Sequence, residues 1–268
     1  MAIDPCSSQT LTGPDGAELV VCAHGGHVTG WTPAGGRGRL WLSPTAECGP
    51  GLAIRGGVPV IFPQFAGRGP LPKHGVARNR AWAVVDSGPG HWAARLEDDE
   101  KTRDIWPHAF ELVLTARAAG QTLDLELTAR NTGDSAWDFT AALHSYFTVG
   151  DSGATIAGLG GRAASDNADG RTTVLDEVLR ALDTRDVSVE GATGPVLLDD
   201  PELGRLTVTA NGFPDRVVWN PGPGHGLGDV PAGGESGFVC IEPALLEPVE
   251  LAPGSAWTGT VRVEAGIR

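Results

Sequence analysis

Alternation of apolar and polar residues in 110–117 and 122–130, with Val113 as the one exception, constrains the fold of this chain most strongly. Every second residue of each stretch is apolar, and charged or hydroxylated residues stand between the apolar ones of the second stretch. A period of two places the apolar side chains on one face of a β-strand, and one polar face is typical of antiparallel sheet. The short link 119–121 contains a glycine, as hairpins often do. The pattern therefore predicts two paired strands over a core.

Similar strand patterns recur along the rest of the chain. They occupy 17–31 (two strands broken at Gly25-Gly26), 81–86, 91–96, 136–149, 205–219, 238–242 and 257–263. Residues 97–105 are charged and suit a turn of helix, whereas 150–200 is weakly patterned. The 39 glycines and 20 prolines disfavour long helices. Because no linker divides the chain, we predict an all-β fold, a large antiparallel β-sandwich in a single domain over 1–268.

Charge and hydropathy exclude several classes of partner. The formal net charge of -13 argues against nucleic acid. No apolar run approaches the ~20 residues that cross a bilayer, and the N-terminal residues lack the basic start and apolar core of a secretory signal. We therefore expect a cytoplasmic monomer that acts on a small molecule, with neither a nucleic-acid nor a membrane partner.

The four cysteines, Cys6, Cys22, Cys48 and Cys240, form no C-x-x-C pair. Their spacing indicates no disulfide framework and no zinc site, so we expect reduced thiols. His24 and His27 stand on either side of the Gly25-Gly26 break, but the neighbouring sequence offers no third metal ligand. No cofactor is predicted.

Residues 48–85 form a purely basic window in an acidic chain. The window contains no acidic residue, and its cations are Arg55, Arg68, Lys73, Arg78 and Arg80. Local positive charge on an acidic protein suggests a site for a small anion; the alternative is a solvated surface loop with scattered arginines. Gly56-Gly57 would let the backbone approach a ligand closely, and Pro59, Pro63, Pro70 and Pro72 stiffen the segment and disfavour a helix.

Two residues far apart in the sequence are candidates for acid–base chemistry. His144 follows an apolar run and shares a strand face with Tyr146, and Glu242 ends the apolar stretch 238–241. A buried histidine needs a partner or a function, and glutamate is rarely buried unless paired. The alternatives are a hydrogen-bonded core histidine and a strand-end glutamate that reaches solvent. Together the pair suits a metal-free acid–base reaction on a small anionic molecule.

A series of short motifs then appears in a characteristic order. They are Arg55-Gly-Gly-Val-Pro59, Phe62-Pro-Gln64, Pro72-Lys-His-Gly75, Ala77-Arg-Asn-Arg80, Trp106-Pro-His-Ala-Phe-Glu-Leu112, Leu143-His-Ser-Tyr-Phe147, Val218-Trp-Asn-Pro221 and Cys240-Ile-Glu-Pro243. Each motif is weak alone, but in this order they are specific. From about Val20 to its end the chain closely resembles the glucose-6-phosphate 1-epimerase branch of the aldose 1-epimerase superfamily.

The resemblance implies a β-sandwich of the galactose mutarotase type that interconverts the α and β anomers of a hexose 6-phosphate. The residues that match the family's functional positions are His144 and Glu242 (catalytic), Arg55 and Arg78 (substrate and its phosphate), Gln64 and His74 (sugar site) and Asp186 (sugar-binding aspartate). This chain departs from the family pattern in three places. Asp186 is followed by Val187 instead of arginine, Lys73 stands where the family often has glutamine, and 222–226 replaces a bulkier stretch.

Two other functions remain open at this point. An epimerase of unphosphorylated aldoses would share the acid–base pair but would not need the basic window. A carbohydrate-binding protein without catalysis could share the fold, although it would need neither His144 nor Glu242. A glycosidase is disfavoured, because two carboxylates would be expected at its site.

Overall fold

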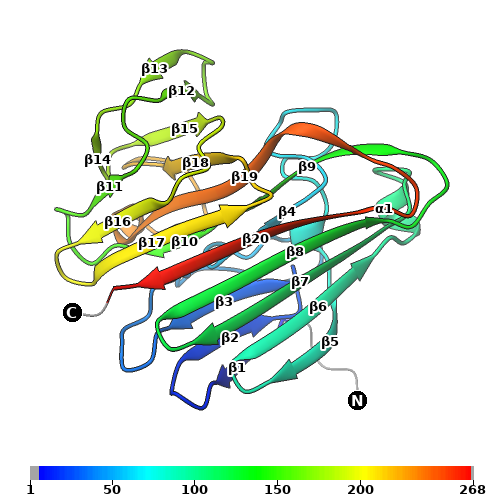
Figure 1. The fold of residues 1–268 in the computed structure, drawn as a ribbon, viewed down its shortest axis with the longest axis horizontal. Coiled ribbons are helices and arrows are strands. Elements are labelled where there is room, and N and C mark those ends of the chain that lie inside the picture. The colour runs from blue at the N-terminus through cyan, green and yellow to red at the C-terminus, as the bar shows by residue number, and fades with distance from the viewer. Residues whose placement is uncertain (1–5, 267–268) are drawn as a thin grey trace.

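The computed structural model describes residues 6–266, which fold into three antiparallel β-sheets (Figure 1). The largest sheet has nine strands. In spatial order they are β14 (Val178–Arg180), β11 (Thr155–Ala157), β16 (Val196–Asp200), β17 (Gly204–Asn211), β20 (Ala256–Ala265), β8 (Thr122–Asn131), β7 (Phe110–Ala119), β6 (His91–Glu97) and β5 (Ala83–Gly88).

An eight-stranded sheet forms the second layer of the sandwich. Its order is β13 (Thr172–Val174), β12 (Ala163–Asp166), β15 (Arg185–Val189), β18 (Asp215–Asn220), β19 (Phe238–Leu251), β9 (Trp137–Leu143) and β4 (Val60–Ile61), and β10 (Tyr146–Thr148) also pairs with β19. A small third sheet contains β1 (Ser8–Thr12), β2 (Glu18–Cys22) and β3 (His27–Thr32). The helical elements are short: α1 (Glu100–Arg103) and the 3₁₀ turns η1 (Ala77–Asn79) and η2 (Gly234–Gly237). The predicted antiparallel β-sandwich is thus confirmed.

The hairpin predicted from alternation is present as β7 and β8. Leu114 lies opposite Leu127, and the apolar residues of both strands are buried while their neighbours are more exposed. Complete burial of a leucine side chain stabilises a fold by roughly 1.5–3 kcal/mol, so a one-residue slip of this register would be costly. The period of two therefore predicted correctly both that these strands pair and which of their faces covers the core.

An aromatic cluster in this core anchors the middle of the basic window. The ring of Phe62, directly after β4, lies 5.4 Å from the rings of Trp106 and Phe110 and 5.5 Å from that of Phe139. These partners come from the segment after α1, from β7 and from β9, so Phe62 joins the window to both large sheets. Aromatic pairs of this kind contribute about 0.5–1.5 kcal/mol each beyond their buried area.

Three local predictions differ from the observed elements. The strand expected over 136–149 is interrupted at His144-Ser145, which separates β9 from β10. Glu242 does not end its strand, because β19 continues to Leu251. The prolines of the basic window do not prevent one turn of 3₁₀ helix, which lies beyond the last of them.

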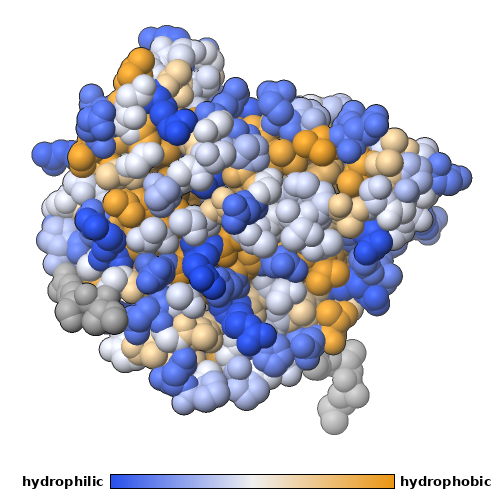
Figure 2. All heavy atoms as spheres, in the orientation of Figure 1, coloured by the Kyte–Doolittle hydropathy of each residue, from blue (hydrophilic) through white to orange (hydrophobic). Residues whose placement is uncertain are grey.

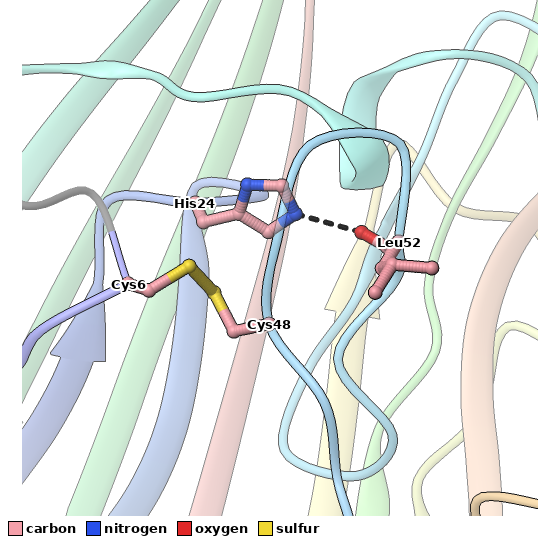
Figure 3. Close-up of a disulfide and its surroundings, with 4 residues drawn as sticks. All are labelled: Cys6, His24, Cys48 and Leu52. Atoms are coloured by element: carbon pink, nitrogen blue, oxygen red, sulfur yellow. Dashed lines mark hydrogen bonds between the residues drawn. A yellow bond between two sulfur atoms is a disulfide. The ribbon is translucent and has the colours of Figure 1, made fainter.

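The prediction of reduced thiols is wrong for one pair, because Cys6 and Cys48 form a disulfide with their Cα atoms 5.8 Å apart (Figure 3). The two cysteines are 42 residues apart in sequence, so spacing could not reveal that the chain brings them together. The side chain of His24 lies beside the disulfide, and its Nε2 is 2.7 Å from the carbonyl oxygen of Leu52. Cys22 and Cys240 are buried elsewhere.

The surface of the protein mixes hydrophobic and hydrophilic residues. On the face drawn in Figure 2, hydrophobic residues lie in small groups between hydrophilic ones. Among residues 6–266, no helix is long and apolar enough to span a membrane.

Candidate active site

A cavity of about 410 Å³ lies between the basic window and the strands that carry the acid–base candidates. Six of the seven residues predicted for the site line this cavity: Arg55, His74, Arg78, His144, Asp186 and Glu242. They come from segments spread over nearly 190 residues of sequence, so the fold itself assembles the site.

Strand register places His144 opposite Glu242. On one side of the break between β9 and β10, Ala142 pairs with Ala244 of β19, and on the other side Tyr146 pairs with Cys240. His144 Nδ1 lies 3.3 Å from Glu242 Oε1, and only 8% and 2% of the two side chains are exposed. The two groups are not aligned as a hydrogen bond, and Glu242 Oε2 has no partner in the described part of the chain. A buried histidine and a buried carboxylate thus face the cavity together.

Burial shifts the two pKa values of this pair in opposite directions. Burial lowers the pKa of His144 well below its ordinary value, and His74, Arg78 and Arg55 lower it further. Burial raises the pKa of Glu242 well above its ordinary value, and the nearby Asp186 adds to this effect, while Arg78 opposes it. Shifts of this kind are typical of functional sites, and both favour the uncharged form of each group.

Tyr146 does not line the cavity, but it contacts two residues that do, and we did not predict this role from the sequence. Its ring stacks on the ring of His144 with centroids 4.9 Å apart and planes 8° from parallel. Its hydroxyl accepts a hydrogen bond of 2.8 Å from Arg55 Nη1, and burial raises the pKa of the phenol. The signal was available, because this is the only tyrosine of the chain and stands two residues after His144.

Arg55 is held by a second residue that the sequence analysis missed. Its Nε donates to Asp229 Oδ2 at 3.0 Å, from the loop that follows β18. Burial lowers the pKa of Arg55, but Tyr146 and Asp229 raise it by more, so the guanidinium stays charged. Arg55 is therefore both oriented and partly neutralised before any substrate arrives.

The backbone on each side of Arg55 is fixed by two buried histidines. His24 contacts the carbonyl oxygen of Leu52, and His27 Nε2 lies 2.8 Å from the carbonyl oxygen of Gly56. Gly57 has φ +61°, and a Cβ there would come within 2.4 Å of the Val28 carbonyl oxygen. This glycine thus permits a close approach to strand β3 rather than to a ligand. Because their rings serve the loop in this way, His24 and His27 act as structural residues.

His74 points its ring into the cavity from a left-handed backbone conformation with φ +68°. The Ala66 backbone N–H donates to His74 Nδ1 at 3.3 Å, so the ring proton of the neutral form lies on Nε2. Burial, together with Arg78, Lys73 and Arg55, lowers the pKa of His74 to about 2. His74 is therefore a neutral hydrogen-bond donor for a polar ligand.

Arg78 lies on η1, and its charge has no carboxylate partner within 4.0 Å in residues 6–266. Burial lowers its pKa, Tyr146 raises it and Arg55 lowers it. Its Nε is buried and makes no hydrogen bond to the described residues. A largely buried guanidinium without a counter-charge is unfavourable until an anion approaches.

Gln64 is the predicted site residue that does not line the cavity. Its Nε2 donates to the carbonyl oxygens of Ala66 and Leu71, and its Oε1 accepts from the Leu71 N–H at 2.9 Å. These bonds use the side-chain amide to close the loop between Gln64 and Leu71. Gln64 thereby supports the segment that carries His74.

Asp186 lies on β15 and lines the cavity. Its Oδ1 accepts a hydrogen bond of 2.6 Å from Asn167 Nδ2. Burial raises the pKa of Asp186, while Asn167 and Lys73 lower it. The carboxyl group is thus placed to receive hydrogen bonds from hydroxyl groups of a bound molecule.

The described chain contains two separate groups of potential metal ligands, and within each group the ligand atoms lie within 4.8 Å of one another. One contains His144, Cys240 and Glu242, but burial raises the pKa of the Cys240 thiol well above its ordinary value, and a protonated thiol is a poor ligand. The other contains His24 with Cys6 and Cys48, whose sulfurs are joined to each other. Neither group has the donor set of a preformed metal site.

The site combines a buried acid–base pair, neutral hydrogen-bonding groups and cations in a pocket of small-molecule size. The antiparallel sandwich is the fold of solved structures titled as a galactose mutarotase related enzyme of Lactobacillus acidophilus and a galactose mutarotase-like protein of Lactobacillus casei, each with a TM-score of 0.78 at 16% identity. Residues 7–264 match the aldose 1-epimerase family. The chain belongs to the aldose 1-epimerase family, whose activity is the interconversion of sugar anomers.

Individual relatives agree with this assignment. A protein of Cenchrus ciliaris is 34% identical over 94% of this chain and 86% of its own length, and one of Escherichia coli is 35% identical over 84% and 79%. Both bear the name "Putative glucose-6-phosphate 1-epimerase". A crystal structure from Salmonella typhimurium, titled as a "putative mutarotase", has a TM-score of 0.86 at 30% identity and covers 99% of this chain and 92% of that one.

Proposed function

We propose that the protein interconverts the α and β anomers of a D-hexose 6-phosphate, with glucose 6-phosphate as the first candidate. The observation that carries the proposal is the single cavity that joins the His144–Glu242 pair to the cations Arg55 and Arg78. A neutral sugar would leave the charge of Arg78 without a counter-ion, whereas a phosphate would supply one. The names of the relatives point to the same substrate.

The proposed reaction is a proton exchange across the sugar ring. The Glu242 carboxylate takes the proton of the anomeric hydroxyl, and protonated His144 gives its proton to the ring oxygen. The bond between C1 and the ring oxygen breaks while the C1 carbonyl forms, which gives the open-chain aldehyde. After rotation about C1–C2, His144 takes back the proton and Glu242 protonates the carbonyl oxygen as the ring closes on its other face.

Burial of the pair assists this ring opening. A raised pKa makes Glu242 a stronger base and a lowered pKa makes His144 a stronger acid. Each proton transfer of the opening step therefore goes toward the uncharged form that the buried site favours. Because the two groups are 3.3 Å apart, one proton shared by the pair is sufficient for the whole cycle.

Anchoring gives the reaction its geometry. Arg55 and Arg78 would hold the phosphate by charge-assisted hydrogen bonds, and Asp186 and the Nε2 proton of His74 would contact the sugar hydroxyls. Fixing the far end of the sugar positions C1 and the ring oxygen against the acid–base pair. A sugar without phosphate would be held less firmly and should react more slowly.

Anomer exchange measured by NMR saturation transfer tests the proposal, with glucose 6-phosphate and glucose in parallel. We expect faster exchange of glucose 6-phosphate and a smaller effect on glucose. The His144→Ala variant should lose the acceleration, and a turnover close to wild type in this variant would remove His144 from the mechanism. Equal acceleration of both sugars would contradict the phosphate specificity, and no acceleration of either would contradict the activity.

A further inference from the structure

We propose that Lys73 is a specificity-determining residue whose ammonium group contacts the phosphate of the substrate. The inference rests on the proposed function and extends it to a residue at the exposed rim of the same cavity. Lys73 would add to the preference for the phosphorylated sugar that Arg55 and Arg78 are proposed to give.

The backbone of Lys73 is held rigidly at the rim. Lys73 follows Pro72, and the Gly75 N–H donates to the Pro72 carbonyl oxygen at 2.8 Å, which closes a turn around it. The next residue, His74, donates its backbone N–H to Ala66 at 3.0 Å. Because the backbone is fixed on both sides while the side chain is long and exposed, the ammonium can follow a phosphate with little rearrangement.

The charge of Lys73 is uncompensated, in contrast to that of Arg55. Arg55 already binds Asp229 and Tyr146. No carboxylate of the described chain lies within 4.0 Å of the Lys73 ammonium, as every ion pair among residues 6–266 involves other cations. A free cation at the rim is therefore available to an incoming anion.

The nearby cations do not take this role in its place. Arg68 does not line the cavity, and its Nη2 already donates to Asn167 Oδ1 and Ser188 Oγ. Arg78 is deeper and makes only a long contact of 3.5 Å to the Lys73 carbonyl oxygen. Lys73 thus adds a second uncompensated cation beside Arg78, and the two lie on one loop and its following 3₁₀ turn.

The positive field of Lys73 also reaches the interior of the cavity. Lys73, Asp186 and Glu242 all line this cavity, so Lys73 borders the space that a substrate would occupy. Its charge lowers the pKa of Asp186 and that of Glu242. A phosphate at the rim would lie between this ammonium and the Arg78 guanidinium.

Lysine labelling tests the contact without reference to activity. The chain has only two lysines, Lys73 and Lys101, and the exposed Lys101 on α1 serves as an internal control. Acetylation by an amine-selective reagent, followed by mass spectrometry, would give both rates in one sample. We expect glucose 6-phosphate to slow acetylation of Lys73 several-fold and glucose to leave it unchanged. Equal rates at Lys73 with and without the sugar phosphate would overturn the contact.

A matched pair of variants, Lys73→Gln and Lys101→Gln, tests the specificity. We expect Lys73→Gln to lower kcat/KM for glucose 6-phosphate on the order of ten-fold, as loss of a charged hydrogen bond would, with little effect on glucose. Lys101→Gln should leave both values unchanged. If wild type prefers the phosphorylated sugar and Lys73→Gln keeps that preference, this inference fails alone. If wild type shows no such preference, the phosphate specificity of the proposed function fails.

Discussion

Protonation of His27 should destabilise the folded protein as the pH falls below 6.5. His27 is fully buried beneath the loop of Arg55, and burial lowers the pKa of its ring from 6.5 to about 4. The Gly56 carbonyl opposes this shift, whereas His24 and Arg78 add to it. Between these two pH values the unfolded chain binds a proton that the folded protein does not bind.

The sign and size of the effect follow from that difference. Because the folded pKa is the lower one, the stabilising contribution is complete above pH 6.5 and is lost as the pH falls toward 4. At 1.36 kcal/mol for each pKa unit the full loss is about 3 kcal/mol, and about 2 kcal/mol of it falls between pH 7 and pH 5. A loss of that size is a large part of the stability of an ordinary domain.

Urea unfolding at pH 7 and pH 5 provides the assay, with wild type compared to His27→Gln. Glutamine carries no titrating group and can still donate to the Gly56 carbonyl, so the variant should lose about 2 kcal/mol less than wild type between the two pH values. His91→Gln, at the partly exposed start of β6, is the control and should behave like wild type. Equal losses in wild type and His27→Gln would refute the reasoning.

Three further predictions concern the site and its supports. Glu242→Gln should lower kcat for anomer exchange by about 10²–10⁴-fold while the fold is kept, because an amide cannot take up the proton. Near-normal turnover in this variant would contradict the role of Glu242 as the base. Cys48→Ser removes the disulfide that links Cys6 to Cys48 across 42 residues, and it should lower the free energy of unfolding by up to about 4 kcal/mol. Urea unfolding checks this, and an unchanged denaturation midpoint would contradict it. Tyr146→Phe removes the oxygen that accepts from Arg55 and should raise KM for glucose 6-phosphate several-fold more than it lowers kcat, whereas an effect on kcat alone would argue against this role.

The regular part of the fold was accessible from the sequence because it depends on local pattern. Alternation in β7 and β8 encodes which face is buried, and the observed register agrees with it. The ends of elements were less accessible. Glu242 looked like the end of a strand, but β19 continues past it because Pro243 and Ala244 are buried as well and pair with Arg216 and Asp215 of β18.

Long-range pairings were the part that the sequence could not show. The resemblance identified six of the residues that line the cavity, but nothing in the linear order indicated that Asp229 binds Arg55 or that Cys6 meets Cys48. The role of Gln64 was also hidden, because its hydrogen bonds depend on the path of the loop up to Leu71. Such contacts are set by three-dimensional closure, which no period or spacing records.

His144 and Glu242 lie opposite each other in a hydrogen-bonded sheet, whereas most of the charged groups around them come from loops. On the proposed function, this separates the machinery of proton exchange from the selection of the sugar. Substitutions in the exposed part of the basic window, 67–73, or in the loop 221–237 can change the preferred ligand without moving the acid relative to the base. In proteins with this arrangement, substitutions in the loops could change which sugar is bound, while the strands keep the same acid–base pair in place.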